Sequence, residues 1–359
     1  MLLFLFYLES MIVMEQHHKQ YFWGVVGVVA LISYVFEGGR PYSLLFFFVA
    51  LADYYDATLF QMGFILLIGF LIAYLKFYHI EIVGKGPYNA GYRQYKHDGI
   101  DVSVFYPSMS NGKKPKWIPS ESYNPVLYDI FYVDPATYRL PYRLFRYAVS
   151  FLFKFDMPVL GDASLCVDDH DSNEKWTVIV FSHGLGSNLN NYSALCGWWA
   201  SHGYIVVCIQ HDQDHVRIDF PSKLRKNPDA LVEYLYSRRN ADIIVRAKET
   251  RSVYKEIIEG KLLQTVFKEV GEIRLDTVYL GGHSFGSGTI LETMSTMMEK
   301  GDDLTPIKGM ICLDPWFFPM SQSTYDNVKN QNMLIINTDT FLDVQPYFYG
   351  AKEKLLRVK

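Results

Sequence analysis

The segment TVYLGGHSFGSGTILETMSTMMEK, residues 277–300, decides the fold. It starts with TVYL, a short apolar run typical of a strand buried on both faces of a sheet, and ends in a helical pattern. Between them lies GHSFG at 282–286, so Ser284 occupies a tight turn from strand to helix. Gly282 and Gly286 leave room where the strand and the helix cross. This context predicts a strained backbone at Ser284 and a hydroxyl exposed at the end of the sheet, as a nucleophile requires.

The chain around this segment alternates strand patterns with helical ones. A helical pattern covers Asp229–Tyr254, directly after Asn227-Pro228, a plausible cap and first-turn pair. Ile100–Tyr106 alternates polar and apolar residues, as an antiparallel strand does. The alternation predicts an α/β protein with a doubly wound, mostly parallel sheet and helices on both faces. The other runs that we expect to be buried strands are Trp176–Phe181, Tyr204–Ile209, Met310–Leu313 and Met333–Ile336.

A second glycine-rich motif, SHGLG at 182–186, follows the predicted strand WTVIVF. Its glycines, Gly184 and Gly186, allow the backbone to approach a bound group closely. In a sheet of this kind the loop after an early strand supplies one backbone N–H for an oxyanion, and the residue after the nucleophile supplies the other. We therefore expect the amides of Leu185 and Phe285 to form an oxyanion hole, helped by the positive end of the helix dipole.

Three acidic residues compete for the role of orienting a catalytic imidazole. Asp314 follows the strand MICL in the sequence LDPW, and Asp339 and Asp343 follow the next strand. In folds with a turn of this kind, the triad runs serine, then acid, then histidine along the chain, and the acid lies at the carboxyl end of a strand. All three residues satisfy this order.

FSHGLG, WWASHGYIVVCIQHD, GHSFGSGT and LDPWFFP, in this order, resemble the platelet-activating factor acetylhydrolases of the plasma and intracellular type II family. These are also called lipoprotein-associated or group VII phospholipases A2, and the resemblance covers about Lys85 to the C-terminus. It implies an α/β-hydrolase fold and a serine esterase, independent of calcium and of any cofactor. Such an enzyme removes the short or oxidised sn-2 acyl chain of phospholipids through an acyl-serine intermediate. It implies Ser284 as nucleophile, Asp314 as acid, and the Leu185 and Phe285 amides as the hole.

The motifs describe the reacting centre and not the substrate pocket. A carboxylesterase or an acyl-thioester hydrolase of the same fold is therefore an alternative. A catalytically inactive membrane protein that binds lipid is a third interpretation, from a different class of function.

We expect the general base to be a histidine that follows the acid along the chain, but none of the 10 histidines follows Ser284. The family's catalytic histidine follows one more strand beyond the acid, and Leu355–Lys359 resembles only the start of that strand. We expect the sequence to be a fragment that stops before this loop; a natural pseudoenzyme or an upstream substitute are the alternatives. His211 and His215 are the nearest substitutes, although we expect them to be structural or to line the substrate site. Neighbouring residues on such a turn point apart, which disfavours His283.

The first part of the chain, residues 1–84, has a different composition. It contains three uncharged, largely apolar runs at about 21–36, 41–52 and 57–75. Because a helix needs about 20 apolar residues to cross a bilayer, we expect two or three membrane helices ahead of a hydrolase domain at 85–359. A buried core hairpin is the alternative. Acidic residues precede the last run and basic ones follow it, which leans toward a cytosolic catalytic domain on a multi-pass membrane protein.

Residues 139–155 (RLPYRLFRYAVSFLFKF) mix basic and aromatic side chains. This pattern suits an amphipathic helix at a lipid surface, and a helix packed on the sheet with a basic edge suits it equally.

The composition excludes two classes. A formal net charge of -4 argues against a nucleic-acid binder, and the hydrophobic content of 50% excludes intrinsic disorder. The four cysteines form no CxxC pair and have no histidine at zinc-site spacing, so we expect no metal site. The oligomeric state has no signal in the sequence.

Overall fold

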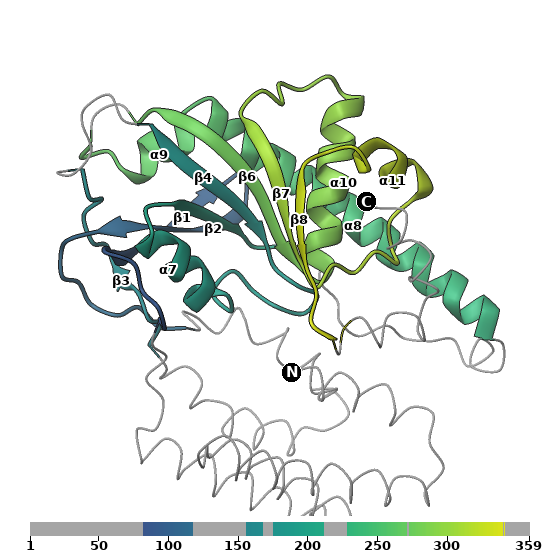
Figure 1. Cartoon of the computed structure of the whole chain (residues 1–359), viewed down its shortest axis with the longest axis horizontal. Coiled ribbons are helices and arrows are strands. Elements are labelled where there is room, and N and C mark those ends of the chain that lie inside the picture. The colour runs from purple at the N-terminus through teal and green to yellow at the C-terminus, as the bar shows by residue number, and fades with distance from the viewer. Residues whose placement is uncertain are drawn as a thin grey trace, which may run out of the picture. The chain divides into compact units, whose positions relative to one another are not determined.

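Eight strands form one mixed sheet within residues 82–117, 156–167, 175–211, 228–270, 273–339 and 341, which a computed structural model describes (Figure 1). The strand order is β3-β1-β2-β5-β4-β6-β7-β8. The bounds are β1 Asn89–His97, β2 Ile100–Ser108, β3 Leu160–Gly161, β4 Trp176–Ser182, β5 Ile205–Ile209, β6 Leu275–His283, β7 Ile307–Leu313 and β8 Met333–Ile336.

The strands from β5 through β8 run parallel, and the other edge of the sheet contains an antiparallel hairpin. β2 pairs antiparallel with both β1 and β5, and the short β3 pairs parallel with β1. Asp98 and Gly99 join the hairpin with φ values of 46° and 87°, which suit the tight turn that matches strand twist. The prediction of a mostly parallel sheet is confirmed.

Helices cover both faces of the sheet (Figure 1). On β4, Val178 and Val180 join the apolar core beneath α8 and α10, whereas Ile179 and Phe181 join the core beneath α7. This alternation follows from the two-residue period of a strand. The helices are α7 Ser193–Ser201, α8 Pro228–Ile258, α9 Lys261–Val266, α10 Phe285–Glu299 and α11 Gln322–Val328.

Each strand predicted from an apolar run is present, as is the long helix predicted from Asp229, which begins at Pro228. Burial of Met333–Ile336 was predicted wrongly, because β8 is the last strand of the described sheet and exposes Leu334 and Ile336. β1 was not predicted from the sequence, because GYRQYKH carries Arg93, Lys96 and His97 along a strand near the edge of the sheet. α7 was not predicted either, because SALCGWWAS is short and has a glycine at its centre.

The membrane prediction concerns a part of the chain that is not described. Within the described ranges, no helix combines the length and apolar character needed to cross a bilayer. The runs predicted to span the membrane, 21–36, 41–52 and 57–75, and the basic-aromatic segment 139–155 all lie outside those ranges.

Candidate active site

Ser284 occupies the turn between β6 and α10, at the carboxyl end of the parallel strands. Its backbone has φ 54° and ψ −117°, a combination that residues with a side chain rarely adopt. Two hydrogen bonds maintain it: the Ser284 amide donates to the Leu313 carbonyl at 2.8 Å, and its carbonyl accepts from the Trp316 amide at 3.1 Å. The structure thus has the strained turn that the sequence predicts, and β7 and the loop after it keep the strain in place.

Two glycines around Ser284 are required by contacts between backbones. A Cβ on Gly282 would lie 2.4 Å from the carbonyl oxygen of Gly286, and one on Gly286 would lie 2.1 Å from that of Ser182. Neither contact can relax by rotating a side chain. The crossing of β6 with α10, and of α10 with the end of β4, therefore depends on these two residues.

The two predicted oxyanion donors lie on segments that follow the neighbouring strands β4 and β6. Phe285 is the first residue of α10, and Leu185 lies in the loop after β4. A Cβ on Gly184 would lie 3.3 Å from Nδ1 of His283, so this loop packs directly against the turn at the nucleophile. Among the described residues, neither amide donates to a backbone carbonyl. That these two N–H groups form an oxyanion hole stays a prediction.

Asp314 is the acid that the structure places beside this turn. It directly follows Leu313, whose carbonyl receives the Ser284 amide, and the residue is buried. Its carboxylate accepts hydrogen bonds from the Thr338 amide at 2.6 Å and the Thr338 hydroxyl at 3.2 Å. Asp339, a rival in the sequence, is exposed, and Asp343 lies outside the described residues.

His283 has contacts that the sequence reasoning did not anticipate. Its Nε2 lies 3.8 Å from the Asp314 carboxylate, and its Nδ1 lies 2.7 Å from the hydroxyl of Tyr192. That hydroxyl also accepts a hydrogen bond from the Gly184 amide at 3.2 Å. Burial raises the pKa of Tyr192 to about 12 and lowers the pKa of His283, although Asp314 opposes the second shift. Through these contacts His283 connects the loop after β4 to the acid.

Of the two histidines predicted as the nearest substitutes for the base, His211 lies within the described residues. His211 is buried at the end of β5, with Nε2 2.9 Å from the Ser182 hydroxyl and Nδ1 2.6 Å from the Glu249 carboxylate. This agrees with the expectation that His211 is structural. His215 lies outside the described residues.

The strand order, the strained serine and the acid after β7 define a protein of the α/β-hydrolase fold. Comparison with known families then gives a more specific result. The family model described as platelet-activating factor acetylhydrolase, isoform II, matches residues 79–349. The chain belongs to this family, as its motifs indicate.

Curated relatives with the name platelet-activating factor acetylhydrolase are similar at low identity. The protein of Gallus gallus is 26% identical over 293 residues, which are 72% of this chain and 65% of that protein. The protein of Cavia porcellus is 25% identical over 307 residues, 77% of this chain and 66% of that one. The chain thus matches slightly less than two thirds of the length of each relative.

Among solved structures, a ferulic acid esterase from Streptomyces cinnamoneus is similar with a TM-score of 0.39 and 18% sequence identity. The match covers 75% of this chain and 73% of the esterase.

Proposed function

We propose that this chain is a serine esterase that transfers an acyl group from an ester to Ser284 and then to water. The observation that carries the proposal is the strained turn at Ser284, with φ 54°, beside two N–H groups that have no backbone acceptor among the described residues. A turn of this kind presents a hydroxyl to a substrate, and the amides stabilise the charge that develops in the transition state.

The reaction proceeds in two steps. The Ser284 hydroxyl oxygen attacks the ester carbonyl, and the carbonyl oxygen becomes an oxyanion between the Leu185 and Phe285 amides. A general base takes the hydroxyl proton of Ser284 during the attack and gives it to the oxygen of the leaving alcohol as the bond between that oxygen and the acyl carbon breaks. Water then attacks the acyl-serine, loses its proton to the base, and the base returns a proton to the Ser284 oxygen as the acid product leaves. An acid in this place along the chain orients and stabilises an imidazolium in triads of this kind, and we assign that role to Asp314. No histidine follows Ser284 in the printed sequence, so we assign no residue to the base.

For the substrate, we propose phospholipids with a short or oxidised sn-2 acyl chain, hydrolysed without calcium. Membership in the platelet-activating factor acetylhydrolase family supports this choice, as do the names of the relatives.

A fluorophosphonate probe tests the nucleophile, and a substrate panel tests the specificity. We expect the probe to label the wild-type chain and to leave Ser284→Ala unlabelled. The panel compares a short-chain phosphatidylcholine with its long-chain counterpart, a simple aryl acetate and an acetyl thioester, each with and without a calcium chelator. Faster turnover of the aryl ester or the thioester would favour a general esterase or a thioesterase. Absence of both labelling and turnover would favour an inactive lipid-binding protein.

We also propose that residues 21–75 anchor the chain in a bilayer as a multi-pass segment with the catalytic domain in the cytosol. The support is the low charge of this region of the sequence. The full-length chain is expected to remain in the membrane pellet after alkaline carbonate extraction. Protease added to sealed vesicles tests the orientation, because a cytosolic domain is cut without detergent.

A further inference from the structure

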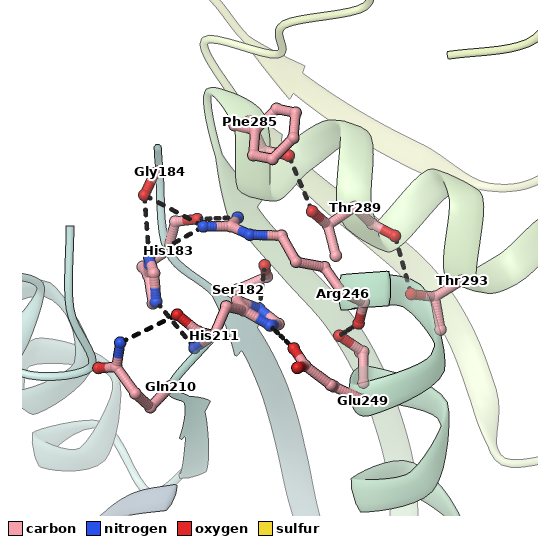
Figure 2. Close-up of polar contacts among 11 residues, drawn as sticks. Ser182, His183, Gly184, Gln210, His211, Arg246, Glu249, Phe285, Thr289 and Thr293 are labelled. Carbon is pink, nitrogen blue, oxygen red and sulfur yellow. Dashed lines mark hydrogen bonds and ion pairs between the residues drawn. The ribbon is translucent and has the colours of Figure 1, made fainter. Parts of the chain in front are cut away.

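The loop that supplies Leu185 has a buried cation beneath it. Arg246 of α8 is fully buried, and its guanidinium donates to the His183 carbonyl at 2.8 Å and approaches the Gly184 carbonyl at 3.5 Å (Figure 2). The same guanidinium lies over the ring of Phe285, 4.7 Å from its centroid. One side chain thus touches the backbone just before one oxyanion donor and the side chain of the other.

The imidazole of His183 contacts the Gly184 carbonyl, which the guanidinium of Arg246 also approaches. Its Nε2 accepts a hydrogen bond from the His211 amide at 3.3 Å, which assigns the proton to Nδ1. Nδ1 then donates to the Gly184 carbonyl at 2.8 Å (Figure 2). Arg246 Nη2 is 3.3 Å from Nδ1, and with both nitrogens carrying protons this is a packing contact. The Gly184 oxygen therefore faces three donors: His183, Arg246 and, from the loop itself, the Ser187 amide at 3.2 Å.

These contacts bear on the Leu185 amide through the planarity of the peptide bond. The Gly184 carbonyl and the Leu185 N–H belong to one peptide unit, and the described residues contain no cis peptide bond. In a trans peptide the C=O and the N–H point in opposite directions, so fixing the carbonyl fixes the N–H. The need for such a constraint is clear from the sequence, because Gly184 and Gly186 flank Leu185 and glycine permits a peptide to rotate at little cost.

The energetics indicate why an arginine is present. Burying a guanidinium is costly unless its N–H groups find acceptors, and an apolar side chain of similar volume would fill the space beneath the loop without that cost. A planar guanidinium can donate to adjacent carbonyls on one side while its face stacks on an aromatic ring. The arrangement around Arg246 uses both properties.

We propose that Arg246, together with the His183 imidazole, is a positioning residue that holds the Gly184–Leu185 peptide with its N–H directed to the oxyanion. The inference rests on the proposed esterase function, because an oxyanion hole has a role only in such a reaction. It adds a requirement to that function: the loop motif alone does not set the donor, and a residue of α8 must complete it.

The test compares Arg246→Met and Arg246→Lys with Arg251→Met on the same helix. Arg251 pairs with Asp302, which keeps Lys255 as a second partner at 3.0 Å, so this variant is a matched control away from the loop. Two phospholipid analogues report on binding: a trifluoromethyl ketone that forms an oxyanion on Ser284, and an ether that has no carbonyl at that position.

Both Arg246 variants are expected to weaken ketone binding by about 10²–10³-fold, the usual effect of losing one oxyanion donor, and to leave ether binding unchanged. Lys is expected to resemble Met, because an ammonium lacks the planar fork. Equal weakening of both analogues would show a general loss of structure and would overturn the proposal, as would unchanged ketone binding.

Crystal structures of the same variants separate this inference from the proposed function. A Gly184–Leu185 peptide that has rotated in Arg246→Met and keeps its orientation in Arg251→Met supports the positioning role, even if the wild-type chain binds no ketone and the esterase proposal fails. An unrotated peptide overturns it. If neither Arg246 variant folds, His183→Phe removes the second side-chain donor to the Gly184 carbonyl and is judged by the same two measurements.

Discussion

Two neighbouring strands of the sheet end in the same two residue types in opposite order. β4 ends in Ser182, followed by His183, and β6 ends in His283, followed by Ser284. Ser182 has the hydrogen-bond pattern associated with an activated serine, with its hydroxyl 2.9 Å from Nε2 of His211. His211 in turn contacts Glu249 at 2.6 Å. The hydroxyl of Ser284 has no hydrogen-bond partner among the described residues.

An aligned serine, imidazole and carboxylate therefore do not by themselves make a nucleophile. Ser182 is fully buried on a regular strand, so no substrate carbonyl can reach it. Ser284 is partly exposed on a strained turn, next to the start of a helix. Access and oxyanion donors distinguish the two positions more than the hydrogen bond to a histidine does.

The largest expected effect is that of Ser284→Ala, with Ser182→Ala as its matched control. Ser284→Ala should abolish labelling by a fluorophosphonate and lower any esterase rate by about 10⁶-fold, the scale seen when a nucleophile is removed. Ser182→Ala should retain labelling, because Ser182 is buried. Gel fluorescence with mass spectrometry of the labelled peptide measures both. A label on Ser182 would contradict the comparison.

If Asp314 orients a catalytic imidazole, Asp314→Asn should lower the labelling rate and any esterase rate by about 10⁴-fold, because an amide favours the wrong imidazole tautomer. Asp339→Asn is the matched control, since Asp339 is exposed and follows β8. Steady-state kinetics of the two variants provide the measurement. A larger loss at Asp339 than at Asp314 would reassign the acid.

Gly286→Ala should destabilise the fold by about 3 kcal/mol or more, because the new methyl group would meet a backbone carbonyl that cannot move aside. The new Cβ would lie 2.1 Å from the Ser182 oxygen. Gly301→Ala, at φ 65° in open space, should cost only about 1–2 kcal/mol of backbone strain. Urea denaturation followed by circular dichroism measures the two free energies of unfolding. Equal losses would mean that the crossing at Gly286 is not tight.

The smallest expected effect is on the pH dependence of stability. Burial, with further contributions from Arg246 and His183, lowers the pKa of His211 well below its ordinary value of 6.5. Below pH 6.5 the unfolded chain therefore binds more protons at this residue than the folded chain does. The free energy of unfolding should fall with decreasing pH in this window, by at most about 1.4 kcal/mol per pH unit.

His211→Gln tests this slope, because glutamine keeps hydrogen-bonding capacity and does not titrate. Urea denaturation of the two proteins between about pH 7.5 and 5.5 should give a shallower slope for the variant. A steeper slope for the variant would show that the carboxylate of Glu249 dominates and that the folded protein favours the charged imidazole.

The sequence could predict the parts of the site that depend on local backbone patterns. A strand, a glycine-flanked serine and a helix define the turn at Ser284 within one segment, and continuous apolar runs define the buried strands around it. Leu185 and Phe285 follow from their places next to these motifs.

Residues that depend on contacts between distant segments could not be predicted. Arg246 lies in a helical pattern where a charged side chain usually faces solvent, although its neighbours Ile243 and Ala247 are buried, a sign of an apolar face. Tyr192 belongs to no motif, and its contact with His283 exists only after the loop following β4 packs against β6. The contact between His283 and Asp314 depends in the same way on the pairing of β6 with β7.

The hydrogen bonds of Asp314 have a consequence for the order of events during synthesis. The Asp314 amide donates to the Ile336 carbonyl at 2.7 Å, and its carboxylate receives both donors of Thr338. At about 5–20 residues per second, the ribosome completes the turn at Ser284 seconds before it makes the residues that fix the acid. The nascent chain therefore passes through a stage in which the serine is formed and its acid is not yet placed. The emergence and pairing of β8 end that stage.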